Sequence, residues 1–147
     1  MRPYPVLLFL LAVVYTACRP GQPQVEQAQA EEEVDLNEFY NFYQSFHIDS
    51  AYQMDHIIFP LQGLPANADS ITIARNNYHW EREDWILHQP VDFETSEFRR
   101  EILPLSEEIV LEKIVHRSGQ TGMLRRFAKI GDDWYLIYFA DLNRIRQ

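Results

Sequence analysis

The chain has 147 residues, enough for one domain, and its net charge of −9 comes from 22 acidic and 13 basic side chains. This acidic balance argues against nucleic acid or anionic lipid headgroups as partners, because both need clustered Lys and Arg. Hydrophobic residues make up 46% of the chain and aromatic residues 14%, so the chain can bury a sizeable core.

The first residues have the layout of a bacterial signal peptide. A single basic residue, Arg2, precedes an apolar run over Val6–Val14. This run is too short to span a bilayer and has the length of a signal peptide's hydrophobic core. We therefore expect a signal peptide over residues 1–17.

Cys18 follows this segment directly and is the only cysteine of the chain. The stretch Val14–Cys18 resembles a bacterial lipobox in its small residues before the cysteine, although Tyr15 stands where leucine is usual. The alternative is a free thiol after an ordinary signal-peptidase site, and we favour lipid attachment because Cys18 has no cysteine to pair with. Acyl chains on Cys18 would anchor the protein through buried methylene groups. Arg19 replaces the aspartate associated with inner-membrane retention, so resemblance to Gram-negative sorting rules indicates the outer membrane of the cell envelope.

Residues 18–33 combine prolines, glutamines and an acidic run, and they contain almost nothing to bury. Such a segment cannot offset the entropy lost on ordering, so we expect a flexible acidic tether. The remaining residues, 34–147, show no internal repeat and no sign of a second domain. We expect them to form a single α+β domain.

The first folded element is predicted to be an amphipathic helix that begins near Asp35. Asp35 and Glu38 have the spacing of a capping box. Large apolar side chains then recur at helical spacing and form one face. An aromatic face of this kind is usually core, which indicates a helix held in the concavity of a sheet. Its members are Leu36, Phe39, Tyr40 and Tyr43, with Phe42 and Phe46 beside them.

A second, short helix is predicted from Ser50, with Gln53 completing a similar capping box. The segment Ile57–Leu61 is predicted to be extended, because a proline pushes the residue before it out of the helical region. Residues 62–70 form a loop by composition, and Ile71–Ile73 have the character of a short strand.

The stretch before the last third of the chain is less regular. Residues 76–87 fit either a short amphipathic helix or an irregular segment pinned by its tryptophans. The proline after Gln89 ends this segment. Val91–Leu105 contains spaced apolar residues and is predicted to include an edge strand.

The last third predicts three consecutive strands, at Ile109–His116, Met123–Ile130 and Trp134–Phe139. The connections over residues 117–122 and 131–133 are rich in turn-forming residues. The last strand is apolar at every position, so both of its faces should be covered and it should lie inside the sheet.

Two adjacent arginines, Arg125 and Arg126, lie on the second of these strands and must point to opposite faces. Cross-strand pairing with Glu112 or Glu108 is the ordinary explanation for such a pattern. Helices first and a long antiparallel meander last predict an α+β fold, with the helices on one side of a bent sheet.

Four phrases of the sequence resemble an uncharacterised family of Bacteroidota lipoproteins. They are residues 35–42, 50–54, 58–61 and 127–136, and the resemblance spans roughly Val34–Leu142. It implies a nuclear transport factor 2-like, cystatin-like cone, in which a strongly bent antiparallel sheet wraps the N-terminal helices. It implies no established chemistry.

Sequence motifs for chemistry are few. The five histidines form no HxxxH or HxH pair, so we expect no metal site. No phosphate-binding glycine loop, nucleophile elbow or cysteine nucleophile is present either, and we expect no cofactor and no catalytic residue. Cone-shaped folds often enclose a pocket, and the ligand-pocket candidates are Trp80, Trp85, His116, Arg126 and Tyr138.

Three functions remain open at this stage. We favour a non-enzymatic, lipid-anchored envelope protein that binds a small apolar ligand or a protein partner. The first alternative is a small-molecule isomerase or dehydratase that uses His116 or Asp84 as its base. The second is a structural subunit that forms a homodimer through the open face of its sheet.

Overall fold

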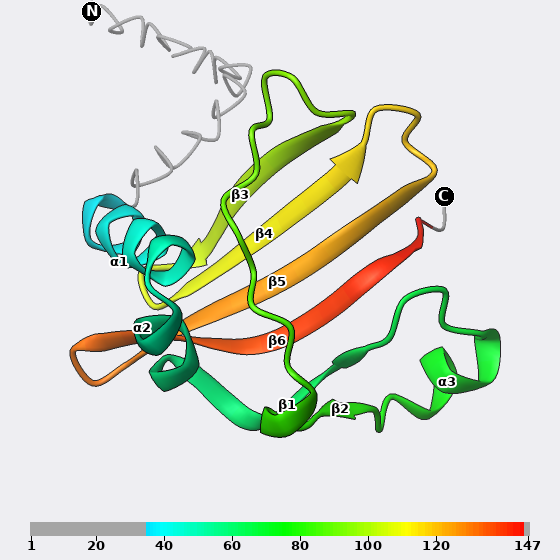
Figure 1. The fold of residues 1–147 in the computed structure, drawn as a ribbon, viewed down its shortest axis with the longest axis horizontal. Coiled ribbons are helices and arrows are strands. Elements are labelled where there is room, and N and C mark those ends of the chain that lie inside the picture. Colours follow the sequence, from blue (N-terminus) through cyan, green and yellow to red (C-terminus); the bar gives the residue numbers. More distant parts are fainter. Residues whose placement is uncertain (1–34, 146–147) are drawn as a thin grey trace, which may run out of the picture. The chain divides into compact units, whose positions relative to one another are not determined.

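The computed structural model describes residues 35–145. The predicted signal peptide, the tether and Cys18 lie outside the described residues. The described chain forms three α-helices, one 3-10 helix and six strands in one sheet (Figure 1). In chain order they are α1 (Asn37–Ile48), α2 (Ser50–Asp55), β1 (Ile57–Leu64), α3 (Ser70–Arg75), β2 (His79–Trp80), η1 (Arg82–Asp84), β3 (Phe98–Ser106), β4 (Ile109–His116), β5 (Thr121–Ile130) and β6 (Asp133–Arg144).

The strands lie in the order β2-β1-β6-β5-β4-β3. Strand β1 runs parallel to β6, and the other neighbours are antiparallel. The predicted meander is therefore confirmed, with β4 at the predicted residues and with β5 and β6 longer than predicted. Strand β6 lies inside the sheet, as its continuous apolar run indicated, and β3 lies at the edge. The α+β prediction is confirmed.

Helix α1 packs on one face of the sheet, which we call the inner face (Figure 1). Phe39, Phe42 and Phe46 are buried there against Phe127 of β5 and Trp134 of β6. The ring centroids of Phe39 and Trp134 lie 5.1 Å apart, in an edge-to-face arrangement. Burial of each of these side chains stabilises the fold by about 1.5–3 kcal/mol. The predicted helix in the concavity of the sheet is confirmed.

The predicted details of the helix starts are wrong in three respects. Leu36 occupies the N-cap position of α1. The carboxylate of Asp35 still accepts from the N–H of Asn37 at 2.9 Å, but Glu38 completes no capping box because it pairs with Lys129 of β5. Tyr40, predicted on the apolar face, is exposed because its side of the helix faces away from the sheet. Helix α2 is capped by Asp49, whose carboxylate accepts from two backbone N–H groups, so Gln53 completes no capping box.

The middle of the chain also departs from its prediction. Ile71–Ile73 lie in α3 and not in a strand, because the carboxylate of Asp69 accepts from the N–H of Thr72 and starts a helix. The local cap outweighs the strand propensity of two isoleucines. Residues 76–87 contain β2 and η1 and are otherwise irregular. None of the helices within residues 35–145 has the length and apolarity that crossing a membrane requires.

Candidate functional site

Residues 85–93 form an irregular segment, called the strap below, that crosses the inner face of the sheet (Figure 1). It leaves η1 near β1 and reaches the start of β3 on the opposite edge. Trp85 and His88 of the strap pack on Phe139 of β6, with ring centroids 5.5 and 4.6 Å away. The strap thus covers the part of the inner face that α1 and α2 leave open.

Gln53 of α2 ties the strap to the helices. Its side-chain nitrogen donates to the carbonyl oxygens of Phe46, at 2.6 Å, and His88, at 2.9 Å. Its side-chain oxygen accepts from the N–H of His88, at 2.7 Å, and from the indole N–H of Trp85, at 3.3 Å. The side chain is almost fully buried and uses all of its donors and acceptors. Nothing in the sequence indicates this role, because the partners lie far along the chain.

A buried polar network lies beneath the strap, between α1 and the sheet. Glu112 of β4 and Arg125 of β5 are direct register partners and are 0% and 4% exposed. Nη1 of Arg125 donates to Glu112, at 3.0 Å, and to Nε2 of His47, at 3.1 Å. The hydroxyl of Tyr43 donates to the other oxygen of Glu112. The predicted cross-strand pairing is confirmed for Arg125.

Hydrogen bonding fixes the tautomer of His47. Because a guanidinium only donates, Nε2 of His47 must accept, so its Nδ1 carries the hydrogen and donates to the carbonyl of Tyr43 at 2.8 Å. Burial, followed by the nearby guanidinium of Arg125, lowers the pKa of His47. Burial, followed by the charge of Glu112, raises the pKa of Tyr43 to about 12. At neutral pH the only charges in this network are therefore those of Glu112 and Arg125.

Part of the Arg125 guanidinium has no partner within residues 35–145. Both hydrogens of Nη1 are used, by Glu112 and His47. Nε is buried and finds no acceptor among the described side chains and carbonyls. Buried polar groups without a partner are rare and call for an explanation.

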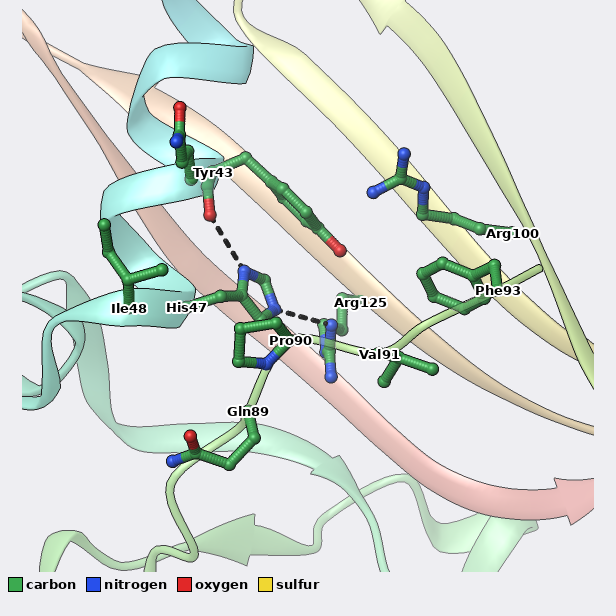
Figure 2. A pocket seen from close by; sticks show the side chains of 10 residues that line it. Tyr43, His47, Ile48, Gln89, Pro90, Val91, Phe93, Arg100 and Arg125 are labelled. Carbon is green, nitrogen blue, oxygen red and sulfur yellow. Dashed lines mark hydrogen bonds between the residues drawn. The ribbon is translucent and has the colours of Figure 1, made fainter. Parts of the chain in front are cut away.

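Two hollows open on the inner face, one on each side of the strap, and Arg125 lines both. The helix-side hollow has a volume of about 220 Å³ and lies between α1, the strap and β3 (Figure 2). The tryptophan-side hollow has a volume of about 190 Å³. The helix-side hollow is lined in part by Tyr43, His47, Ile48, Val91, Phe93 and Arg100, and the tryptophan-side hollow by Trp80, Trp85, His88, Met123, Phe139 and Asp141.

The two hollows differ in charge. The guanidinium of Arg100 lies 5.2 Å from the ring centroids of both Tyr43 and Phe93, at the mouth of the helix-side hollow (Figure 2). No Asp or Glu is among the residues that line this hollow. The tryptophan-side hollow contains Asp141. It also contains His88, whose pKa burial lowers to about 2, so that this imidazole is neutral.

The structure brings together two of the five predicted pocket residues. Trp80 and Trp85 both line the tryptophan-side hollow, with ring centroids 6.2 Å apart. The indole N–H of Trp80 donates to the carbonyl of Phe139 at 3.0 Å. These two tryptophans therefore have a structural role, because they attach β2 and the strap to the sheet.

The other three predicted residues, His116, Arg126 and Tyr138, lie outside both hollows. Arg126 and Tyr138 are register partners on the outer face of the sheet, where the guanidinium lies 5.4 Å from the ring centroid. His116 ends β4 and interacts with Ser118 and Glu97. Asp84, the other suggested base, is exposed on η1.

None of the residues that line the helix-side hollow is among the predicted pocket residues. Arg125 had a usable signal: Phe127, a large apolar residue two positions on, faces the core, so Arg125 must face inward as well. The roles of Tyr43, His47 and Arg100 depend on how α1 and β3 dock, which local patterns do not encode. Within the described residues, no three His, Cys, Asp or Glu side chains are close enough to hold a metal ion.

Comparisons with known proteins find similarity among solved structures alone. No protein-family model and no curated protein sequence matches the chain. A crystal structure of a protein of unknown function from the DUF3225 family of Pectobacterium atrosepticum is similar, with a TM-score of 0.39 and 10% identity, over 74% of this chain and 85% of that chain. Helices on the inner face of a six-stranded, mostly antiparallel sheet are the α+β arrangement that the sequence predicts.

Proposed function

We propose that the protein is a lipid-anchored protein of the cell envelope whose domain binds a small ligand on the inner face of the sheet and catalyses no reaction. One observation carries the binding role: the strap, tied down by Gln53, leaves a hollow on each side of it above a buried arginine. Small-molecule sites are concave, mostly apolar and supplied with a few polar groups, as these hollows are.

The chemistry of the hollows favours binding over catalysis. A general base needs a free nitrogen or oxygen within reach of the substrate and a pKa near the working pH. Both ring nitrogens of His47 are hydrogen-bonded, and the carboxylate of Glu112 is held by Tyr43 and Arg125. With its pKa lowered to about 2, His88 is too weak a base at neutral pH. The isomerase or dehydratase alternative at His116 or Asp84 gains no support, because neither residue lines either of the two inner hollows.

The anchor is supported by the lipobox-like stretch before Cys18 and by the acidic tether after it. In Gram-negative cells we expect the wild-type protein to carry acyl chains and to fractionate with the outer membrane, whereas Cys18→Ala should carry none. Mass spectrometry of the two purified proteins measures the difference. A mass for the wild type that equals its polypeptide alone would remove the anchor from the proposal.

Binding in the helix-side hollow can be tested by filling it. Ile48 lines this hollow and is 69% exposed, so we expect Ile48→Trp to fill the opening without disturbing the core. The full chain is screened by ligand-observed NMR against a panel of small aromatic and aliphatic acids, amides and amines. We expect at least one class to bind, and Ile48→Trp to lower its affinity about tenfold, equivalent to about 1.4 kcal/mol.

The matched control is Ile71→Trp, since Ile71 is 61% exposed on α3 and lines neither inner hollow. It should leave affinity unchanged. Equal affinities for the two variants, or no binding by any class, would contradict a ligand site in this hollow.

Dimerisation through the outer face stays a prediction from the sequence. That face carries a wider hollow of about 410 Å³, whose charged lining residues have both signs. They are Arg99, Glu101, Lys113 and Arg144.

A further inference from the structure

We propose that the ligand of the helix-side hollow is a small organic carboxylate whose acid group pairs with the free edge of Arg125. This inference rests on the proposed binding function and names its ligand class. We infer it from the guanidinium donors that lack a partner, the charge of the hollow and the nature of its walls.

The donor geometry of Arg125 fits a carboxylate. A guanidinium has two edges on which it donates in parallel, and one of them consists of Nε–H and a hydrogen of Nη2. Glu112 and His47 both accept from Nη1 and leave this other edge without a described partner. Two parallel donors match the two oxygens of a carboxylate in a bidentate pair. Such a ligand would give the buried Nε the acceptor that residues 35–145 do not supply.

The charge balance of the hollow favours one negative charge. Arg100 and Arg125 are cationic, while Tyr43 and His47 are neutral at neutral pH. Glu112 offsets Arg125, and Arg100 forms no ion pair with any described carboxylate, so one positive charge is in excess. The tryptophan-side hollow also reaches Arg125, but Asp141 would repel an anion there. The helix-side hollow is therefore the favoured position.

The walls of the hollow select a short apolar body. The rings of Tyr43 and Phe93 and the aliphatic side chains of Ile48 and Val91 surround the space next to the guanidiniums (Figure 2). Its volume of about 220 Å³ equals the share of about seven waters in the liquid. A carboxylate on a single aromatic ring or a short chain has the matching size, which makes phenylacetate a suitable probe.

The test compares phenylacetate with phenylacetamide, which has nearly the same shape and no charge, and with inorganic phosphate, which has charge and no apolar body. Affinities for the full chain are measured by calorimetry. We expect phenylacetate to bind at least tenfold more tightly than either comparison ligand. The Nε–H resonance of Arg125, identified in ¹H–¹⁵N spectra by its loss in Arg125→Lys, should shift only with phenylacetate.

Neighbouring arginines on β3 provide a matched pair of variants. Arg100 faces the helix-side hollow, whereas Arg99 faces the other side of the sheet, and both are exposed. We expect Arg100→Gln to weaken phenylacetate about two- to fivefold, as for a partly solvated ion pair, and Arg99→Gln to have no effect. If Arg125→Lys fails to fold, the comparison of Arg100→Gln with Arg99→Gln still tests carboxylate binding in the helix-side hollow.

Two results would contradict the assignment of a carboxylate ligand while leaving ligand binding intact. The first is equal affinity for phenylacetate and phenylacetamide, and the second is equal affinity of Arg100→Gln and Arg99→Gln for phenylacetate. Phosphate binding more tightly than phenylacetate would also overturn this assignment and would indicate an inorganic oxyanion. Absence of binding by every acid, amide and amine of the panel would instead remove the proposed function itself.

Discussion

Replacing Glu112 by alanine is expected to lower the free energy of unfolding by about 3–5 kcal/mol, the range found when one partner of a buried ion pair is removed. The reason is that Arg125 stays buried with its charge uncompensated, since its other hydrogen bond is with the neutral His47. The hydroxyl of Tyr43 loses its acceptor at the same time. Urea denaturation followed by tryptophan fluorescence gives the free energy of unfolding for both proteins.

The control for this prediction is Glu101→Ala. Glu101 lies on the outer face and pairs with Arg99 at 3.9 Å, but its side chain is 44% exposed and that of Arg99 is 60% exposed. An exposed pair of this kind contributes about 0–1 kcal/mol, so the control variant should be nearly as stable as the wild type. If Glu112→Ala lowers the free energy of unfolding by no more than Glu101→Ala does, the Glu112–Arg125 pair is solvated.

A double replacement separates the cost of the unpaired charge from the loss of packing. When both partners of a buried pair become apolar residues of similar size, stability is often kept or increased. We therefore expect Glu112→Leu with Arg125→Met to recover most of the stability lost in Glu112→Ala. The same double variant removes the guanidinium donors of Arg125, so a stable protein that no longer binds phenylacetate would show that Arg125 is needed for ligand binding and that the ion pair is not needed for folding.

The parts of the fold that sequence analysis predicts are those with local causes. The strands of the meander end at turns in which Gly119 and Gly131 adopt positive φ values of 75° and 66°, a conformation that favours glycine. Helix α1 follows from an aromatic face at helical spacing, and β3 from the spaced apolar residues within Val91–Leu105. Each of these signals lies within a single element.

The parts that were missed depend on contacts between distant residues. The strap has no periodic pattern, and its position on the inner face comes from Gln53, which is 35 residues from His88 in the sequence. Trp80 and Trp85 are large and aromatic, a property that core residues and pocket residues share, so the sequence alone does not separate the two roles. Arg126 and Tyr138, also predicted to line the pocket, face outward, because the pleat alternation that turns Arg125 inward turns Arg126 outward. The sequence predicts the frame of the candidate site, and its polar centre emerges only from docking of α1, the strap and the sheet.

The strap also links stability to binding, since it forms a wall of both hollows and is hydrogen-bonded to α2 through Gln53. Gln53→Leu keeps the volume of this side chain and removes its hydrogen bonds. We expect it to lower the free energy of unfolding by about 2–4 kcal/mol, because the carbonyl of Phe46 and both backbone groups of His88 lose their partners. Gln62→Ala, at an exposed position of β1, is the control and should change stability by no more than about 0.5 kcal/mol.

Hydrogen exchange distinguishes detachment of the strap from general weakening of the fold. If Gln53 holds the strap, the N–H of His88 should exchange faster in Gln53→Leu by a larger factor than the amides of β5 and β6, which open only with the whole sheet. Affinity for the ligand should fall as well, because one wall of the helix-side hollow would no longer be fixed. If all amides exchange faster by the same factor and the affinity for the ligand is unchanged, Gln53 stabilises the core but does not position the strap. The strap would then be positioned by its aromatic contacts with Phe139.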